Sequence, residues 1–427
     1  MRLNHFIGII AILLLLTVAP WTSQAREDKT ETLKMFSEVL HMIEDNYVHE
    51  KDREELIRGA IKGMLRDLDP HSSYVDMDQL QMMQEDFSGK FGGIGIQIGV
   101  RDDNLVVISP IENTPAYKQG LKPRDLILEI DGESTQGMDL MDAVQKIRGP
   151  KGEPVTLTIL SQEADSPRDV EIVRDEIPVH TVNLKELEPG YVHLRISDFK
   201  ATTTEDLKEK IQEYSSEQDL KGMVLDLRNN PGGLLDQAVS VSDLFLEDGM
   251  IVYTEGREEA QRQDFEASPD SLNADTPIVV LINAGSASGS EIVAGAMQDR
   301  NRALILGEPT FGKGSVQSIM PLSDGSAIKL TIALYYTPDG RAIQAEGINP
   351  DINIPLQQVA ERDEDAEHPA LRESMMEYHI ERPEQEDREE QEERAQEIQE
   401  LLAEDNQLRM ALELLRSMPR IQELRYN

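Results

Sequence analysis

The segment Asn283-Ala284-Gly285-Ser286-Ala287-Ser288-Gly289-Ser290-Glu291 stands between a continuous apolar run at residues 278–282 and a stretch of small and apolar residues at 292–297. The unbroken run predicts a buried strand, and the stretch after it is typical of a buried helix. Ser288 is therefore predicted to lie on a tight turn from strand to helix. The first N–H groups of a helix and the positive end of its dipole lie beside such a turn, where an acyl-transfer oxyanion needs donors.

A second segment, Phe311-Gly312-Lys313-Gly314-Ser315-Val316-Gln317, follows a short apolar run at residues 303–306 that predicts another strand. The glycines beside Lys313 would let the backbone approach another element closely, so that the amine is buried. Burial lowers the pKa of a lysine from its ordinary value of about 10.4 and makes the neutral amine available as a base. Gln317 is placed to hold that amine. Ser288 and Lys313 together predict a serine nucleophile with a lysine base.

Two simpler interpretations fit the same residues. Ser288 followed by Glu291 is an S-x-x-E capping box, and most serines in that setting only cap a helix. A Gly-Lys-Gly sequence is more often an ordinary surface turn than a catalytic loop. Spacing alone therefore leaves the dyad, the cap and the turn open.

Six further motifs follow one another along the chain, and their combination is more specific than any one of them. They are Asp69-Pro70-His71-Ser72-Ser73-Tyr74, Phe91-Gly92-Gly93-Ile94-Gly95-Ile96, Leu225-Asp226-Leu227-Arg228-Asn229-Asn230-Pro231-Gly232-Gly233, Gly307-Glu308-Pro309-Thr310, Tyr335-Tyr336-Thr337-Pro338-Asp339-Gly340-Arg341 and Gly347-Ile348-Asn349-Pro350-Asp351. With these motifs, roughly residues 30–355 resemble the carboxyl-terminal processing (tail-specific) serine proteases of bacteria. That family has a Ser/Lys dyad and an embedded PDZ domain.

The resemblance implies catalytic roles for three residues of these two segments. Ser288 is the nucleophile, Lys313 is the general base, and Gln317 supports the lysine. Such an enzyme is a serine-type endopeptidase that works through an acyl-enzyme, and we expect it to need neither a metal nor another cofactor.

The resemblance also implies an oxyanion hole. The turn at Gly232 and Gly233 supplies one N–H, and the N–H of Gly289 joins it. The family usually has alanine after the nucleophile, whereas this chain has Gly289. A glycine keeps the N–H but gives the turn more conformational freedom, so we expect a looser oxyanion geometry without loss of activity.

Other catalytic chemistries fit the sequence less well. A Ser-His-Asp hydrolase would have a G-x-S-x-G elbow, and Gly285 and Gly289 do not flank Ser288 at that spacing. The eight histidines are scattered, and His71 alone lies inside a matched motif. The chain has no cysteine and no histidine cluster, which argues against a zinc site.

The sequence predicts a multidomain fold of mixed α+β and α/β class. After the amino-terminal segment, apolar residues recur at helical spacing. The pattern then predicts short strands with one helix, and after them strands that alternate with helices. A PDZ domain is thus expected between a helical segment and an α/β core. The predicted divisions are a signal peptide at residues 1–25, an N-terminal helical segment at 26–86, a PDZ domain at 87–165, a serine protease core at 166–356 and an acidic helical tail at 357–427.

The resemblance to PDZ domains points to a peptide site. Such domains add an extended peptide as a strand and receive its terminal carboxylate on the backbone N–H groups of a glycine-rich loop. Gly93 and Gly95 are the matching loop positions, and Ile94 and Ile96 are expected to line an apolar pocket. The simpler alternative is that the glycines only permit a tight entry into a strand.

The beginning of the chain predicts export. Arg2 and His5 precede an apolar run at residues 6–19, and Ser23-Gln24-Ala25 fits a small-x-small cleavage site. The run is shorter than the ~20 residues of a membrane-spanning helix, which favours a cleaved signal peptide over an anchor. We therefore expect a periplasmic enzyme, with peripheral or anchored attachment to the inner membrane as the alternative.

The net charge and the apolar stripe of the C-terminal tail indicate which binding partners to expect. The net charge of −39 makes nucleic acid an improbable ligand. In the tail, Leu401, Leu408, Leu412 and Leu415 belong to an apolar stripe at helical spacing that needs cover. Docking on the catalytic body and pairing between subunits would both hide it. Because a polar stretch of roughly forty residues precedes the stripe, we expect pairing, and hence a homo-oligomer.

These features together predict an endopeptidase that cuts exported proteins near their C-termini. The PDZ domain would capture the substrate's free C-terminus or gate the active site, and an activating adaptor protein is a further expected partner. Two alternatives remain: a noncatalytic PDZ peptide-binding adaptor on a degenerate protease core, and a small-ester hydrolase. The complete set of Ser288, Lys313 and Gln317 argues against the first, and the inserted peptide-binding domain argues against the second.

Overall fold

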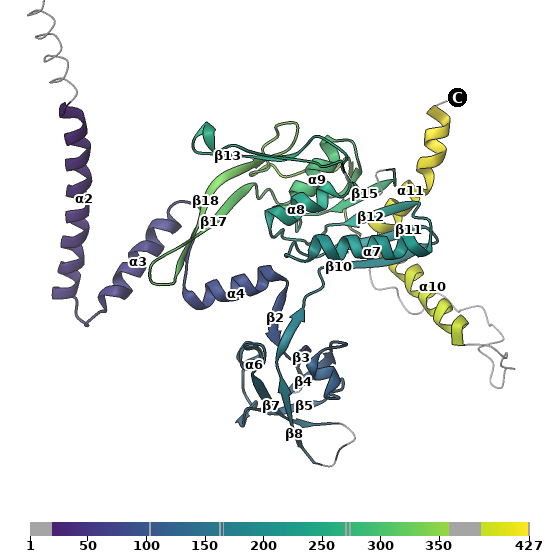
Figure 1. Cartoon of the computed structure of the whole chain (residues 1–427), viewed down its shortest axis with the longest axis horizontal. Coiled ribbons are helices and arrows are strands. Elements are labelled where there is room, and N and C mark those ends of the chain that lie inside the picture. Colours follow the sequence, from purple (N-terminus) through teal and green to yellow (C-terminus); the bar gives the residue numbers. More distant parts are fainter. Residues whose placement is uncertain are drawn as a thin grey trace, which may run out of the picture. The chain divides into compact units, whose positions relative to one another are not determined.

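The computed structural model describes residues 19–101, 104–161, 164, 166–269, 271–272, 275–357 and 386–425, which are coloured along the chain in Figure 1. These residues belong to two compact units. The first comprises Met1–Asp76 and Ser318–Thr331, and the second comprises Met77–Gln317 and Ile332–Asn427. Residues 1–18, which hold nearly all of the apolar run of the predicted signal peptide, lie outside the described part of the chain.

The first unit is built from two helices and a small antiparallel sheet. The helices expected in the N-terminal segment are present, and Asp52 caps the second of them by accepting a hydrogen bond from the Glu55 N–H at 3.1 Å. No helix in the described ranges is at once long and apolar enough to cross a membrane. The elements are α2 (Ala19–Asn46), α3 (Arg53–Arg66), β1 (Ser73–Val75), the end of β17 (Ser315–Pro321) and the start of β18 (Ala327–Tyr336), with β18 paired to both β1 and β17.

The Asp69 motif makes the turn between α3 and β1. The Asp69 carboxylate accepts hydrogen bonds from the backbone N–H groups of His71 at 2.7 Å and Ser72 at 2.8 Å, and from the Ser72 hydroxyl at 2.6 Å. Ser72 Oγ in turn accepts the Thr331 N–H at 3.1 Å. An aspartate that holds the two following N–H groups is a turn-forming device, so this motif has a structural role.

The second unit begins with α4 (Met77–Ser88) and continues into the domain predicted to be a PDZ domain. Five strands form its main sheet in the order β3-β4-β5-β7-β8, with β6 on β5, while β2 pairs with β9. Its elements are β2 (Lys90–Gly93), β3 (Ile96–Arg101), β4 (Asn104–Pro110), α5 (Pro115–Lys118), β5 (Leu126–Ile130), β6 (Glu133–Ser134), α6 (Leu140–Ile147), β7 (Pro154–Leu160), β8 (Arg168–Val173) and β9 (Asp175–Pro178).

The sheet of this domain extends beyond the predicted boundary at residue 165. β8 pairs antiparallel with β7, and Val170 and Ile172 belong to the same buried core as Val155 and Leu157. Because β7 and β8 are neighbouring antiparallel strands, the predicted boundary falls between two strands of one sheet. The domain therefore continues to β9.

A mostly parallel six-stranded sheet forms the catalytic core. Its order is β10-β11-β12-β15-β16-β19, and every neighbouring pair is parallel except β10 with β11. The core elements are β10 (Val182–Glu188), β11 (Tyr191–Ile196), α7 (Thr203–Glu217), β12 (Gly222–Asp226), α8 (Leu235–Asp243), β13 (Met250–Gly256), η1 (Glu259–Gln261), β14 (Gln263–Glu266), β15 (Ile278–Ile282), α9 (Gly289–Asp299), β16 (Leu304–Gly307) and β19 (Ile352–Asn353).

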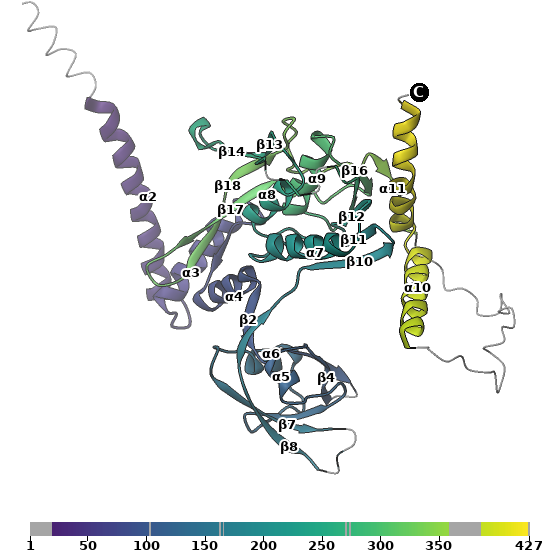
Figure 2. The ribbon, with the colours of Figure 1, turned by 45° about the vertical axis from the view of Figure 1, so that its right-hand side comes forward.

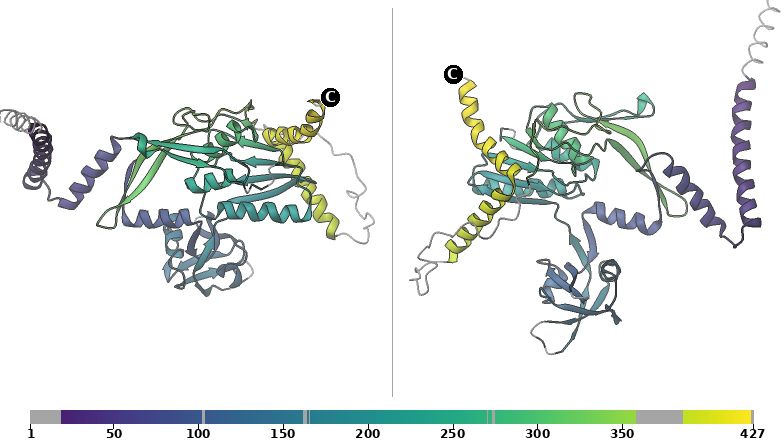
Figure 3. Two further views of the ribbon diagram at one scale, coloured as in Figure 1. Left: turned by 45° about the horizontal axis from the view of Figure 1, so that its top comes forward. Right: turned by 180° about the vertical axis from the view of Figure 1, so that it is seen from behind.

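Helices cover both faces of this sheet, as Figures 2 and 3 show. Along β15, Ile278, Val280 and Ile282 pack with α7, α8 and α9, whereas Val279 and Leu281 face the other way. This alternation is the two-residue period of a strand that is buried on both faces. It explains why the run at residues 278–282 is apolar throughout. The predicted α/β core is confirmed.

The C-terminal helices are α10 (Glu386–Glu404) and α11 (Asn406–Arg425). The second face of the sheet is covered by α11, whose Leu408, Leu412 and Leu415 are buried there. The argument that this stripe needs a second subunit for cover is wrong, because the chain covers it with its own sheet; a homo-oligomer stays a prediction. Residues 358–385 of the tail lie outside the described part of the chain.

The contacts at the start of α11 explain why the linker argument failed. The Gln357 N–H donates to Asn406 Oδ1 at 3.0 Å, and Asn406 Nδ2 donates to the Pro355 carbonyl at 3.0 Å. The residues on either side of the long polar stretch thus lie side by side. Because the entropy of closing a loop grows only with the logarithm of its length, a long connection is a weak argument against internal docking.

Candidate active site

Ser288 lies on the predicted sharp turn between β15 and α9. Its backbone has φ 52° and ψ −109°, in the left-handed half of conformational space. A residue other than glycine held there costs of order 1–3 kcal/mol, and such strain persists only where surrounding contacts impose it. The residue next along the chain begins α9, so the prediction of a strand–turn–helix is confirmed.

The contacts that impose this conformation converge on Glu291, which is fully buried. Its Oε2 accepts the N–H groups of Ser288 at 2.7 Å and Lys313 at 2.9 Å. Its Oε1 accepts the Thr310 hydroxyl at 2.6 Å and the Gly312 N–H at 2.6 Å. One carboxylate therefore joins the backbones of the serine turn and the lysine loop. The sequence identified Glu291 only as a partner in a capping box.

The lysine loop is pressed against the segment at residues 342–346. A side chain on Gly314 would place its Cβ 2.2 Å from the Gln344 nitrogen, and one on Gly312 would place it 3.2 Å from the Ala345 carbonyl carbon. The close backbone approach expected at the two glycines is thus confirmed, whereas burial of the Lys313 amine stays a prediction. Lys313 itself is half-buried.

Gln317 lies on β17, and its amide Nε2 donates to Ser315 Oγ at 2.8 Å and to the Ser315 carbonyl at 3.2 Å. These contacts fix the orientation of the Gln317 side chain. Its support of the Lys313 amine stays a prediction, as does transfer of the Ser288 proton to that amine.

The glycine turn after β12 lies beside the serine. A Cβ on Gly232 would come within 2.7 Å of the Ser288 Cβ and 2.9 Å of the Gly289 nitrogen. The Gly232 N–H donates to Asn230 Oδ1 at 2.9 Å, which leaves the N–H of Gly233 as the turn's available donor. Within the described residues, the N–H groups of Gly233 and Gly289 donate to no protein acceptor. These are the two backbone donors that an oxyanion could use.

The glycine after the nucleophile has a packing reason. A Cβ at Gly289 would lie 3.0 Å from Phe199 Cδ2 and 3.3 Å from the Ala238 Cβ, closer than side chains normally pack. An alanine methyl group here would therefore require the Phe199 ring to shift by a few tenths of an ångström. The looser oxyanion geometry expected from this glycine stays a prediction.

The two serines flanking Ser288 are structural. Ser286 Oγ donates to the Leu227 carbonyl at 2.8 Å, and Ser290 Oγ donates to the Asn230 carbonyl at 2.9 Å. Both side chains are fully buried, whereas Ser288 retains 9% exposure. Of the three, Ser288 is therefore the one placed to meet a substrate.

The predicted peptide site forms a groove between β3 and α6. The hollow measures about 400 Å³, and all four predicted residues line it. A Cβ on Gly95 would lie 2.3 Å from the Thr114 Cβ, so this position excludes a side chain. The lining residues are Phe91, Gly93, Ile94, Gly95, Ile96, Gln97, Ile98, Ile108, Leu140, Met141, Val144, Ile147 and Arg148.

The ends of this groove differ in character. Arg148 lies at the C-terminal end of α6, with its guanidinium 4.3 Å from the centre of the Phe91 ring, so one end carries a positive charge. Met141, at the start of α6, is exposed. Ile94 is buried in the core of the domain, so its replacement by a charged residue would damage the fold as well as the groove.

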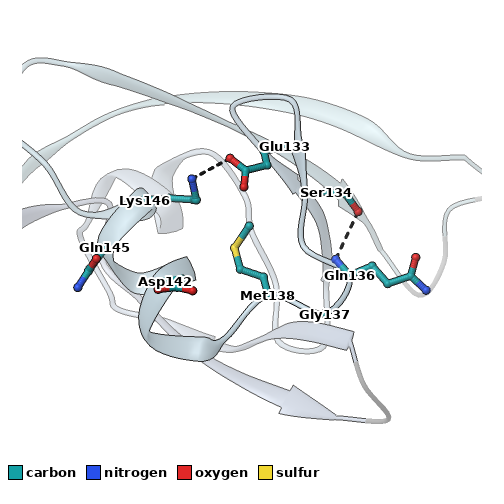
Figure 4. A pocket seen from close by; sticks show the side chains of 8 residues that line it. All are labelled: Glu133, Ser134, Gln136, Gly137, Met138, Asp142, Gln145 and Lys146. Carbon is teal, nitrogen blue, oxygen red and sulfur yellow. Dashed lines mark hydrogen bonds and ion pairs between the residues drawn. The ribbon is translucent and has the colours of Figure 1, made fainter. Parts of the chain in front are cut away.

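A second hollow on the same domain, of about 650 Å³, is polar (Figure 4). It lies between the β6 hairpin and α6, where Lys146 Nζ donates to Glu133 Oε2 at 2.7 Å. Asp142 and Gln145 also line it. Because Met138 is the one apolar side chain in its lining, this hollow fits an apolar peptide side chain less well than the groove beside β3.

Comparison with known proteins agrees with this architecture. Three family models match in order: the activating protease CtpB N-terminal domain at residues 17–79, the PDZ domain at 82–160 and peptidase family S41 at 190–354. The matches define the class as a serine peptidase that carries a PDZ domain.

Individual relatives define the family. A carboxy-terminal-processing protease of Bartonella bacilliformis is 46% identical over 78% of this chain and 77% of its own length. The carboxy-terminal processing protease CtpA of Bacillus subtilis is 39% identical over 74% of this chain and 67% of its own length. Among solved structures, a photosystem II D1 C-terminal processing protease is 29% identical, with a TM-score of 0.44, over 75% of this chain and 92% of that one.

This chain therefore belongs to the carboxy-terminal processing proteases of peptidase family S41, and it is a serine-type endopeptidase. The resemblance drawn from the sequence motifs is confirmed, and so is the PDZ domain between the N-terminal segment and the protease core.

Replacing Glu291 with glutamine tests the junction between the two loops. The amide NH₂ would face two of the four donors, leaving buried groups unpaired at about 1–3 kcal/mol each. We expect kcat to fall by about 10²-fold, because a small misplacement of catalytic groups has effects of that size. Steady-state kinetics measures the fall in kcat, and thermal unfolding followed by circular dichroism measures the loss of stability. Glu308→Gln, a neighbouring change outside this junction, is the control, and equal kinetics for the two variants would contradict the assignment.

Proposed function

We propose that this enzyme cleaves exported proteins near their C-termini through an acyl-enzyme on Ser288. The observation that supports this most strongly is the junction at Glu291, because it joins the strained backbone of Ser288 to the loop that carries Lys313. The names of the relatives, which describe carboxy-terminal processing, support the choice of substrate.

The proposed reaction uses residues of this chain alone. Neutral Lys313 takes the Ser288 hydroxyl proton as the oxygen attacks the scissile carbonyl. The Gly233 and Gly289 N–H groups stabilise the negative charge that develops on the carbonyl oxygen. The protonated lysine then donates to the leaving amine, and a water molecule, activated by the same amine, hydrolyses the acyl-enzyme. Gln317 orients the lysine throughout.

The groove beside β3 supplies a reason for selecting C-termini. An extended peptide would add to β3 as a further strand, with apolar side chains against α6. Its carboxylate would lie at the end where the Gly93–Gly95 loop meets Arg148. Capture of the substrate tail and gating of the active site are both compatible with this site, and an activating adaptor protein remains a prediction.

Cleavage of an unstructured protein tests the assignment of the nucleophile and base. Ser288→Ala and Lys313→Ala should each lower kcat by at least about 10³-fold, because residues that act as one unit fail together. Ser290→Ala is the matched control and should stay within about tenfold of the parent, since it loses one buried hydrogen bond. Product analysis by mass spectrometry follows the reaction. An inactive Ser290→Ala beside an active Ser288→Ala would move the nucleophile to residue 290.

Peptide binding tests the groove. Amidating the C-terminus of a bound peptide should weaken affinity by about 10- to 100-fold, because charge-assisted hydrogen bonds are lost. Met141→Glu should weaken it similarly by placing a charge on the apolar wall. Gln145→Glu makes the same charge change on α6 in the polar hollow and should have little effect. Calorimetry measures all three, and an affinity that ignores both amidation and Met141→Glu would exclude this groove.

We propose further that the enzyme acts in the periplasm after removal of residues 1–25. The support is the apolar run and the small-x-small site in the sequence. The intact mass of the protein purified from its membrane and soluble fractions checks this: a chain that begins at Arg26 is expected. A chain that retains residues 1–25 in the membrane fraction would instead indicate an uncleaved anchor.

A further inference from the structure

The helix α11 packs beneath the three strands that end in the proposed catalytic loops. β12 leads into the Gly232–Gly233 turn, β15 into the Ser288 turn, and β16 into the Lys313 loop. Opposite α9, the sheet presents an apolar surface that α11 covers with an apolar stripe. The contacting side chains are Val224, Val279, Leu281 and Leu306 from the sheet and Leu408, Ala411, Leu412 and Leu415 from the helix.

A buried arginine joins this helix to the oxyanion turn. Arg228 Nε and Nη2 donate to the two carboxylate oxygens of Asp226 at 2.9 and 2.7 Å. Its Nη1 and Nη2 donate to the two oxygens of Asp405 at 3.0 and 2.7 Å, and Nη1 also donates to Gln407 Oε1 at 2.9 Å. The planar guanidinium thus bridges the end of β12 and the start of α11.

Both carboxylates are suited to hold this charge. Burial tends to raise the pKa of Asp226, but hydrogen bonds from His193 and Arg228 outweigh it and hold the pKa of that carboxyl below its ordinary value. His193 Nε2 lies 2.9 Å from Asp226 Oδ2. Asp405 also caps α11, because its Oδ1 accepts the Leu408 N–H at 2.9 Å. A single residue therefore starts the helix and pairs with Arg228.

From Arg228 the chain continues to Asn230, whose own contacts reach the catalytic loops. The Asn230 carbonyl accepts the Ala287 N–H at 3.0 Å and the Ser290 hydroxyl at 2.9 Å, and its Oδ1 accepts the Gly232 N–H at 2.9 Å. Asn230 lies two residues after Arg228, whose backbone N–H also donates to Asp226 Oδ1 at 3.0 Å, so a shift of the Arg228 backbone would be passed along the chain to Asn230. The oxyanion turn and the residues flanking Ser288 share that constraint.

The start of α11 is itself fixed to the core. Gln407 Nε2 donates to the Ile354 carbonyl at 2.7 Å while its Oε1 accepts from Arg228. The contacts of Asn406 with Pro355 and Gln357 lie beside it. Docking of the helix and pairing with Arg228 are therefore formed by the same few residues.

We propose that Asp405 and Gln407 are positioning residues of the active site, which act through Arg228 to hold the Gly233 donor in place for the developing oxyanion. The inference rests on the proposed function, because it assigns a purpose to the oxyanion turn. Loss of the pairing leaves the substrate groove intact and leaves Ser288 held by Glu291, but it lets the oxyanion turn move. The transition state then loses a donor that the bound substrate does not use, so kcat falls while KM changes little.

The test uses the full chain with Asp405→Asn. Asparagine keeps the cap on α11 but removes the charge that Arg228 meets. We expect kcat to fall by about 10- to 100-fold, with KM within about twofold of the parent. Glu397→Gln is the matched control, since it removes an ion pair between α10 and Lys185 at 2.6 Å without touching Arg228. Equal kcat for the two variants would overturn the proposal.

Hydrogen exchange at residues 227–234 gives a second measurement that does not depend on activity. Asp405→Asn should speed exchange there by about tenfold relative to Glu397→Gln, because local opening becomes easier. If the parent fails to cleave any protein, the proposed function is wrong. Unchanged hydrogen exchange in Asp405→Asn would separately overturn the positioning role of Asp405 and Gln407. If Asp405→Asn does not fold, Arg228→Lys takes its place, because it keeps the charge but loses the fork.

Discussion

The catalytic centre depends on the hydrogen bonds that converge on the Glu291 carboxylate. Two loops from different strands reach it, and each brings donors that would otherwise be buried without acceptors. Those bonds offset the strained backbone of Ser288 and fix where the lysine loop begins. The apolar residues of α9 and the sheet then keep the carboxylate dry, where its hydrogen bonds are strongest.

Much of the structure around Ser288 and Lys313 was predictable, because it depends on residues that are near one another in the sequence. An apolar run followed by small residues has few outcomes other than strand, turn and helix around Ser288, and glycines beside Lys313 indicated close backbone packing. The parallel sheet also follows from sequence, since strands that alternate with helices bring their carboxyl ends to one edge. Ordered motifs then identified the family without reference to geometry.

What sequence could not supply depends on contacts between distant residues. Glu291 has the signature of a cap, and only the folded chain brings Thr310 and Gly312 onto its other oxygen. The loop before β8 has the composition of a linker, although pairing with β7 makes it part of a hairpin. The stripe on α11 was visible, but its covering surface lies on strands whose outward residues are as apolar as their inward ones.

The contact between Phe199 and Gly289 has a consequence for any attempt to engineer this enzyme. A methyl group on residue 289 would lie 3.0 Å from Phe199 Cδ2, so the ring would have to shift by a few tenths of an ångström to admit it. The effect of Gly289→Ala therefore reports on the freedom of the Phe199 ring as well as on the turn after Ser288. A residue 89 positions earlier in the chain than Ser288 thus influences which side chain can follow the nucleophile.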